Sequence, residues 1–230
     1  MDVKRETRGA DSPFVQRISR VTYNGDVGDV TTPDGTWDLV FCFRLGRVAI
    51  LQTGQIVRPI DLAYEPGDSY FAIVFKPDVY MPHRPGNMMF HKGIFRPLAA
   101  RDSFWLDNDR LEIPTFDNAE QFVAQLAARG LIARDRVVGY AVEAELEQLD
   151  DRTLERHVAR VTGMTAKMLQ QILRANRAVK LLEGGSRAAD VAADLGYTDQ
   201  SHLTNSLRRI LGRTPGEIAR DSRLRLESGK

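Results

Sequence analysis

The feature that most constrains the fold is a tight turn between two short amphipathic segments, within residues 186–211. Ala192 lies four residues before Gly196. A small residue lets a second helix cross the first closely, and a glycine permits a positive φ in the turn. Ser186 is expected to cap the first helix, which we place at Arg187 to Leu195. The pattern therefore predicts a helix-turn-helix unit.

The second helix of this unit is expected to run over 199–211, with Thr198 or Asp199 as its cap. One face is apolar at helical spacing, which predicts burial of Leu203, Leu207, Ile210 and Leu211. The opposite face carries short hydrogen-bonding side chains first and arginines last. Amides can read base edges in the major groove, whereas arginines hold phosphates. Against the alternative of a merely solvated face, we predict DNA binding by Thr198, Gln200, Ser201, Thr204, Asn205, Arg208 and Arg209.

The stretch that follows the turn has a recognisable form, GYTDQSHLTNSLRRILGRTP, from Gly196 to Pro215. Thr214, Pro215 and Glu217 form a capping-box pattern at the start of another helix. The stretch resembles the AraC/XylS family of transcription regulators, and the resemblance extends over residues 152–219. Arg177 and Leu181 match the long helix that joins the two helix-turn-helix units of that family. The resemblance implies a sequence-specific DNA-binding transcription regulator.

The first of the two units departs from the family pattern. Its recognition helix is placed at 152–161, and the side chains predicted to face DNA are Arg152, Thr153, Arg156 and Arg160. The preceding helix, at 135–149, lacks the expected alanine and turn glycine. Negative charge from Asp150, Asp151 and Glu155 would repel phosphates, unless these acids cap a helix or pair with arginines. We therefore expect this unit to bind DNA more weakly than the second.

Charge is distributed unevenly along the chain. Residues 152–230 contain 15 Lys or Arg and 8 Asp or Glu, whereas the remainder contains 17 and 23, although the whole chain has a net charge of only +1. A basic segment suits a polyanionic partner. Cys42, the only cysteine, lies in an apolar run and is interpreted as a buried structural thiol in a reducing cytoplasm. Neither a signal peptide nor a membrane span is expected, so we predict a cytoplasmic protein.

The N-terminal part is predicted to be rich in strands. Short apolar runs separated by turn residues lie between 21 and 76, whereas residues 1–20 are expected to form a loose arm. Residues 77–97 give no clear pattern, and helical character follows, with a helix at 118–129. The predicted fold class is α+β, with a cupin-like β-barrel domain at 1–134 and an all-α DNA-binding domain at 135–230. A linker is placed near 131–135.

In the AraC/XylS family the N-terminal domain commonly senses a ligand or dimerises, so a small-molecule effector and a second copy of the chain are further candidate partners. The helix at 118–129, with its apolar stripe, is one candidate dimer contact, and packing on its own barrel is the alternative. His83 and His91 are too few for a cupin metal site, and Asp107 and Asp109 are interpreted as a polar loop. No metal, cofactor or catalytic residue is predicted.

Two other classes of function remain open at this point. A cupin-like protein that binds or converts a small molecule, with an appended helical domain, is the rival to a regulator that is not an enzyme. A degenerate regulator whose helices bind a protein is the third reading.

Overall fold

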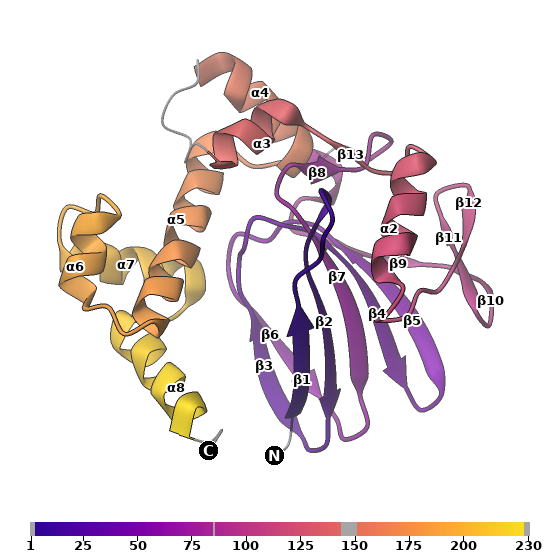
Figure 1. Cartoon of the computed structure of the whole chain (residues 1–230), viewed down its shortest axis with the longest axis horizontal. Coiled ribbons are helices and arrows are strands. Elements are labelled where there is room, and N and C mark those ends of the chain that lie inside the picture. Colours follow the sequence, from indigo (N-terminus) through magenta and orange to yellow (C-terminus); the bar gives the residue numbers. More distant parts are fainter. Residues whose placement is uncertain (1–2, 85, 144–150, 228–230) are drawn as a thin grey trace.

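The computed structural model describes residues 3–84, 86–143 and 151–227. Strands dominate the first part of the chain and helices the last part, as predicted (Figure 1). We call β1–β13 with α1 and α2 the strand-rich part, and α3–α8 the helical part. The division into domains at 134/135 stays a prediction.

The largest sheet of the strand-rich part has six antiparallel strands in the order β1-β2-β7-β4-β5-β9. Three of its strands, at Asp38–Arg44, Arg47–Thr53 and Ser69–Phe75, lie where apolar runs in the sequence predicted strands. The strands are β1 (Val3–Arg8), β2 (Val15–Tyr23), β4 (Asp38–Arg44), β5 (Arg47–Thr53), β7 (Ser69–Phe75) and β9 (Gly93–Arg96).

Three smaller sheets complete the strand-rich part. They are β3 (Val27–Thr31) with β6 (Ile60–Tyr64), β8 (Val79–Tyr80) with β13 (Ala133–Arg134), and β10 (Leu98–Ala100), β11 (Ser103–Leu106) and β12 (Asp109–Glu112). The described strands thus form separate sheets, and not the closed cupin-like barrel that we expected. Residues 98–112, expected to begin a helical region, are strands.

The first residues of the chain are not a loose arm, which corrects our expectation. β1 pairs with β2 along its whole length, and it looks polar in the sequence because it is the edge strand of the sheet. Its charged side chains have partners: Arg5 Nη2 lies 2.7 Å from Asp29 Oδ2, and Arg8 Nη2 lies 2.8 Å from Glu120 Oε2.

The core of the strand-rich part lies between the six-stranded sheet and helix α2 (Ala119–Ala128). The helix was expected at this place. Its apolar stripe is turned into the core, with Phe122 5% exposed and Leu126 fully buried, and the Phe122 ring meets the Phe41 ring edge-on at 6.3 Å. This stripe is therefore not a dimer contact, and the alternative of packing on its own sheet is correct.

The helical part has a separate hydrophobic core. A long central helix, α5, is flanked by the other helices, and α6 lies on its far side from the sheets (Figure 1). The helices are α3 (Arg136–Glu143), α4 (Asp151–Thr162), α5 (Ala166–Glu183), α6 (Ala188–Asp194), α7 (Gln200–Leu211) and α8 (Pro215–Glu227), and the strand-rich part adds the short α1 (Gly86–Met89). No helix in the described ranges is long and apolar enough to cross a membrane.

The segment between the two cores is anchored rather than a free linker. Leu131 and Ile132 are buried in the first core, and β13 pairs with β8. The backbone N–H of Asp135 donates to the Asp78 carbonyl oxygen at 2.9 Å. The helical part therefore begins from a fixed point on the strand-rich part.

Candidate nucleic-acid interface

The turn between α6 and α7 has the geometry that its sequence predicts. Gly196 has φ of +67°, in the left-handed region that favours glycine. The N–H of Tyr197 donates to the Ala192 carbonyl at 2.9 Å, and the N–H of Gly196 donates to the Ala193 carbonyl at 3.2 Å. This pair of bonds is a Schellman motif, which satisfies the last carbonyls of α6 and directs the chain into α7.

The caps of the two helices differ in how well the sequence predicted them. Asp199 caps α7, because its side chain accepts a bond from the His202 N–H at 2.7 Å. We expected Ser186 to cap α6, but it does not. The N-cap position is Arg187, which makes no side-chain capping bond. The Ser186 N–H instead donates to the Leu181 carbonyl, so Ser186 belongs to the end of α5.

The two faces of α7 separate as predicted. Leu203 and Leu207 are fully buried, and Ile210 and Leu211 are nearly so. On the other side the predicted DNA-binding side chains reach solvent. The exposed ones are Thr198, Gln200, Ser201, Asn205, Arg208 and Arg209.

Two of the predicted DNA-binding side chains on α7 already have partners within the protein. The Thr204 hydroxyl donates to the Gln200 carbonyl at 2.8 Å, which leaves its lone pairs as acceptors. Arg209 Nη2 donates to Oε1 of Gln171 at 3.1 Å. Gln171 lies on α5, so Arg209 links the second unit to the central helix while its remaining donors face outward.

The predicted recognition helix of the first unit corresponds to α4. Leu154, Val158 and Val161 face inward and are buried. Arg152, Thr153 and Arg156 are exposed on the opposite side, as expected. The helix that should precede α4 ends its described range at Glu143, and 144–150, with Asp150, lie outside the described residues.

Arg160 is placed differently from Arg152 and Arg156. Its guanidinium forms an ion pair with Asp135 and lies 5.3 Å from the centre of the Tyr80 ring. Tyr80 belongs to β8, so the last arginine of the row contacts the strand-rich part. Sequence reasoning missed this role because neither partner is near Arg160 in the chain.

Asp135 is the buried centre of this contact, and no local pattern in the sequence indicated it. Its side chain is 2% exposed, and it caps α3 by accepting bonds from the N–H groups of Val137 and Val138 at 3.0 and 3.1 Å. Nδ1 of His157 lies 2.7 Å from its carboxylate. Burial opposes ionisation of Asp135, but the hydrogen bonds from His157, Val138 and Arg160 lower the pKa of its carboxyl.

Glu155, one of the acidic residues expected to repel phosphates, has a hydrogen-bond partner within the protein. Oε2 of Glu155 accepts a bond from the Ala166 N–H at 3.1 Å. Ala166 is the first residue of α5, where a carboxylate interacts favourably with the unpaired N–H groups of the helix. Glu155 thus caps a helix, which is one of the two arrangements that the sequence left open.

Arg174 is a further residue that sequence reasoning missed. Its guanidinium carbon lies 4.4 Å from the centre of the Tyr197 ring, and Nη1 is 3.5 Å from the Gly196 carbonyl oxygen. Arg174 therefore fastens the central helix α5 to the turn of the second unit. Cation–π contacts between distant residues leave no pattern in a sequence.

The candidate metal ligands lie apart from one another in the described ranges. There, no group of three or more His, Cys, Asp or Glu side chains is placed to hold a metal ion. Asp107 lies in the turn between β11 and β12 with φ of +56° and pairs with Arg84 at 2.6 Å. Asp109 pairs with Arg129 at 3.3 Å. Cys42 is half-buried rather than buried as expected, and this partial burial raises the pKa of its thiol.

No curated protein matches the chain significantly. Among solved structures, it is similar to ToxT from Vibrio cholerae, at 7% identity and a TM-score of 0.46 over 95% of this chain and 98% of that one. ToxT of strain O395 bound to (E)-4-(8-methylnaphthalen-1-yl)but-3-enoic acid is 8% identical, with a TM-score of 0.46 over 95% of this chain and 98% of that one. ToxT of strain SCE256 bound to an unsaturated fatty acid is 9% identical, with a TM-score of 0.40 over 94% of each chain. At such low TM-scores these likenesses carry no argument about function.

The helix-turn-helix domain family matches residues 144–221 of the chain. This range includes α4, α5 and both helices of the second unit, whose turn and two-faced recognition helix have been described above. The matched family agrees with the resemblance that Gly196 to Pro215 carries in the sequence. Residues 144–221 thus form a helix-turn-helix domain, the DNA-binding module that the resemblance to the AraC/XylS family predicts for this part of the chain.

Proposed function

We propose that the protein recognises a specific DNA sequence by inserting α7 into the major groove. The observation that carries the proposal is the exposure of Gln200, Ser201 and Asn205 on the face opposite the buried leucines. Gln200 lies in the first turn of α7, where recognition helices reach base edges. Arg208 and Arg209 lie in its last turn, where guanidinium groups suit phosphates.

The first unit adds a second and weaker contact in this proposal. Arg152, Thr153 and Arg156 are exposed on α4, whereas Arg160 is engaged by Asp135. Three exposed side chains of this helix therefore remain to bind phosphates, and none of them has an amide that could pair with adenine. We expect α4 to contribute affinity more than sequence preference.

The test compares two substitutions on α7. Gln200→Ala should weaken binding by about 1–3 kcal/mol at one base position and relax the preference there. Arg209→Ala should weaken binding to all sequences alike and lower the slope of log affinity against log salt by about 1. Both variants are titrated against single-base variants of an operator that is first selected from a randomised library.

Arg47→Ala is the matched control, because Arg47 is exposed in the strand-rich part, far from α7 in the sequence. It removes the same charge and should leave both the base preference and the salt slope unchanged. If Arg209→Ala altered base preference while Gln200→Ala weakened every sequence equally, the proposed orientation of α7 would be wrong. Absence of DNA binding by the folded wild type at low salt would reject the proposal itself.

We further propose that the strand-rich part senses a small molecule or joins two copies of the chain, and that the protein acts in the cytoplasm without being an enzyme. In this chain the support is physical: Tyr80, Asp135 and Arg160 connect the strand-rich part to a recognition helix.

A further inference from the structure

The helices α4 and α7, which carry the exposed polar rows, are joined through the central helix α5. α4 lies at the N-terminal end of α5, whereas α6 and α7 lie beside its C-terminal half (Figure 1). α5 has 18 residues and is therefore about 27 Å long. Successive turns of the major groove are about 34 Å apart, so α4 and α7 can contact one stretch of DNA together only if α5 holds each of them in a suitable direction.

The junction between α4 and α5 is short and closed by local contacts. Oε2 of Glu155 accepts a bond from the Ala166 N–H at 3.1 Å, as described above. The hydroxyl oxygen of Thr162, the last residue of α4, accepts a bond from the Met164 N–H at 3.1 Å, and Thr162 is fully buried. The direction of α4 relative to α5 is therefore fixed within the turn that connects them.

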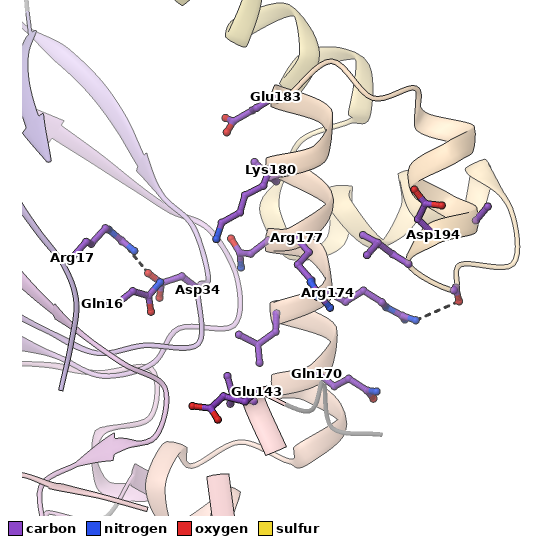
Figure 2. Close-up of a pocket in the computed structure, with 17 residues that line it drawn as sticks. Gln16, Arg17, Asp34, Glu143, Gln170, Arg174, Arg177, Lys180, Glu183 and Asp194 are labelled. Carbon is purple, nitrogen blue, oxygen red and sulfur yellow. Dashed lines mark hydrogen bonds and ion pairs between the residues drawn. The ribbon is translucent and has the colours of Figure 1, made fainter. Parts of the chain in front are cut away.

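The direction of α7 depends on contacts between residues that are far apart in the chain. Besides the shared apolar core, two polar side chains of α5 reach α7, one at each end. Gln171 accepts a bond from Arg209, in the last turn of α7, at 3.1 Å. Arg174 contacts Tyr197 and Gly196, which precede the first turn of α7 (Figure 2). Gln171 and Arg174 are three residues apart and so lie on the same face of α5.

The contact of Arg174 with Tyr197 is a stacking contact rather than a hydrogen bond. The guanidinium carbon lies 4.4 Å from the ring centre, whereas the bond to the Gly196 carbonyl oxygen is long at 3.5 Å. Nε of Arg174 and the hydroxyl oxygen of Tyr197 are both buried and have no hydrogen-bond partner among the described residues. The ring of Tyr197 in turn meets the His202 ring edge-on at 5.3 Å. His202 lies in the first turn of α7, so this stack connects α5 to the turn that carries Gln200.

We propose that Arg174 is a positioning residue, which stacks on Tyr197 and thereby holds α7 in the direction that lets α4 and α7 bind the same DNA site. In this role Arg174 acts through Tyr197 and does not touch DNA itself. The inference rests on the proposed function, in which α7 reads bases and α4 binds phosphates. Two contacts held at a fixed spacing reinforce each other, and the reinforcement is lost when the connection loosens. Loss of the stack should therefore make the contribution of α4 smaller while the exposed side chains of α7 remain in place.

A double-mutant cycle between Arg174 and Arg156 tests this role. Arg156 is exposed on α4, and Arg156→Ala should weaken binding of the full chain to the selected operator several-fold. In an Arg174→Gln background the same change should weaken binding by less than about twofold, because α4 no longer binds together with α7. Arg187→Gln is the matched control, since it removes an exposed arginine at the start of α6. It should leave the cost of Arg156→Ala as large as in the wild type.

Two substitutions of Tyr197 separate the ring from its hydroxyl group. Tyr197→Phe keeps the ring and removes only an oxygen without a hydrogen-bond partner among the described residues, so DNA affinity and the cost of Arg156→Ala should both stay as in the wild type. Tyr197→Leu removes the ring and should reproduce the effect of Arg174→Gln. The two changes act on one contact, so Arg174→Gln combined with Tyr197→Leu should bind no more weakly than the weaker of the two single variants. Urea denaturation checks that each variant is folded.

The outcomes distinguish the positioning role from its alternatives. An arginine that only stabilised the second unit, or that bound a phosphate itself, would leave the full cost of Arg156→Ala in the Arg174→Gln background, and this result would overturn the role. Equal losses of DNA affinity in Tyr197→Phe and Tyr197→Leu would also overturn it. So would an Arg156→Ala change without effect in the wild type, which would leave base reading by α7 intact. A folded wild type that binds no DNA at low salt would instead reject the proposed function, and the positioning role with it.

Discussion

The backbones of Gly86 and Gly163 meet where the strand-rich part contacts the first helix-turn-helix unit. A Cβ atom placed on Gly86 would lie 2.5 Å from the Gly163 backbone nitrogen, and one placed on Gly163 would lie 2.8 Å from the Gly86 carbonyl oxygen. Gly86 begins α1, and Gly163 follows the last residue of α4. With the ion pair of Asp135 and Arg160, this contact fixes α4 against the strand-rich part.

Gly86→Ala should destabilise this contact, because the added methyl group meets backbone atoms that cannot rotate away. The expected loss is about 1–3 kcal/mol in the free energy of unfolding, as for overpacking elsewhere. Gly9→Ala is the control, since nothing lies within 4 Å of a Cβ atom there. Urea denaturation compares the two, and equal stability of both variants would show that the glycine contact is looser than described.

Asp135→Asn tests the charge at the same junction. Asparagine can still cap α3, so the change removes chiefly the ionic part of the bonds to His157 and Arg160. The variant should lose about 2 kcal/mol of stability near neutral pH. Asp11→Asn is the control, because Asp11 is exposed.

The pH dependence of this loss follows from the lowered pKa of Asp135. A carboxyl whose pKa is lower in the folded state than in the unfolded state stabilises the fold above the unfolded pKa of about 3.9. That contribution disappears as the pH falls through the folded pKa. The stability difference between wild type and Asp135→Asn should therefore shrink at pH values below about 4, and a difference that grew there would contradict the assignment.

Local patterns in the sequence predicted the parts of the fold whose cause is local. The α6–α7 turn depends on Ala192 and Gly196, and the helix at 119–128 depends on its own apolar stripe, so both were expected correctly. The edge strand β1 was mistaken for a loose arm, because its ladder is formed with β2 and its charged side chains pair with residues such as Glu120. The strands at 98–112 are too short to show an alternation.

The same distinction holds for the candidate interface. The exposed polar side chains of α7 follow from helical periodicity, so the sequence predicted their position. The burial of Asp135, the engagement of Arg160 and the stacking of Arg174 on Tyr197 depend on which elements meet in space. Ser186 was misassigned for a subtler reason: two glycines precede it, and its N–H completes the end of α5 instead of opening α6.

Gly196→Ala and Gly216→Ala should change stability in opposite directions. Neither has an atom within 4 Å of an added Cβ, but only Gly196 has a positive φ. Alanine at 196 should cost about 1–2 kcal/mol through backbone strain alone. Alanine at 216, in the first turn of α8, should stabilise by up to about 1 kcal/mol. Thermal unfolding of both variants checks the signs, and stabilisation by Gly196→Ala would argue against the described turn.

Arg156→Ala and Arg160→Ala should separate DNA binding from structural anchoring on one helix. Arg156 is exposed, so its loss should lower affinity for all DNA sequences and reduce the salt slope by about 1, with stability unchanged within about 0.5 kcal/mol. Arg160 is held by Asp135 and lies over Tyr80, so its loss should cost about 1 kcal/mol of stability and leave the salt slope as it is. Binding titrations at several salt concentrations, with urea denaturation of the same samples, measure both quantities. A reduced salt slope in Arg160→Ala with unchanged stability would mean that Arg160 leaves Asp135 to bind phosphate, so that this ion pair is broken when DNA binds.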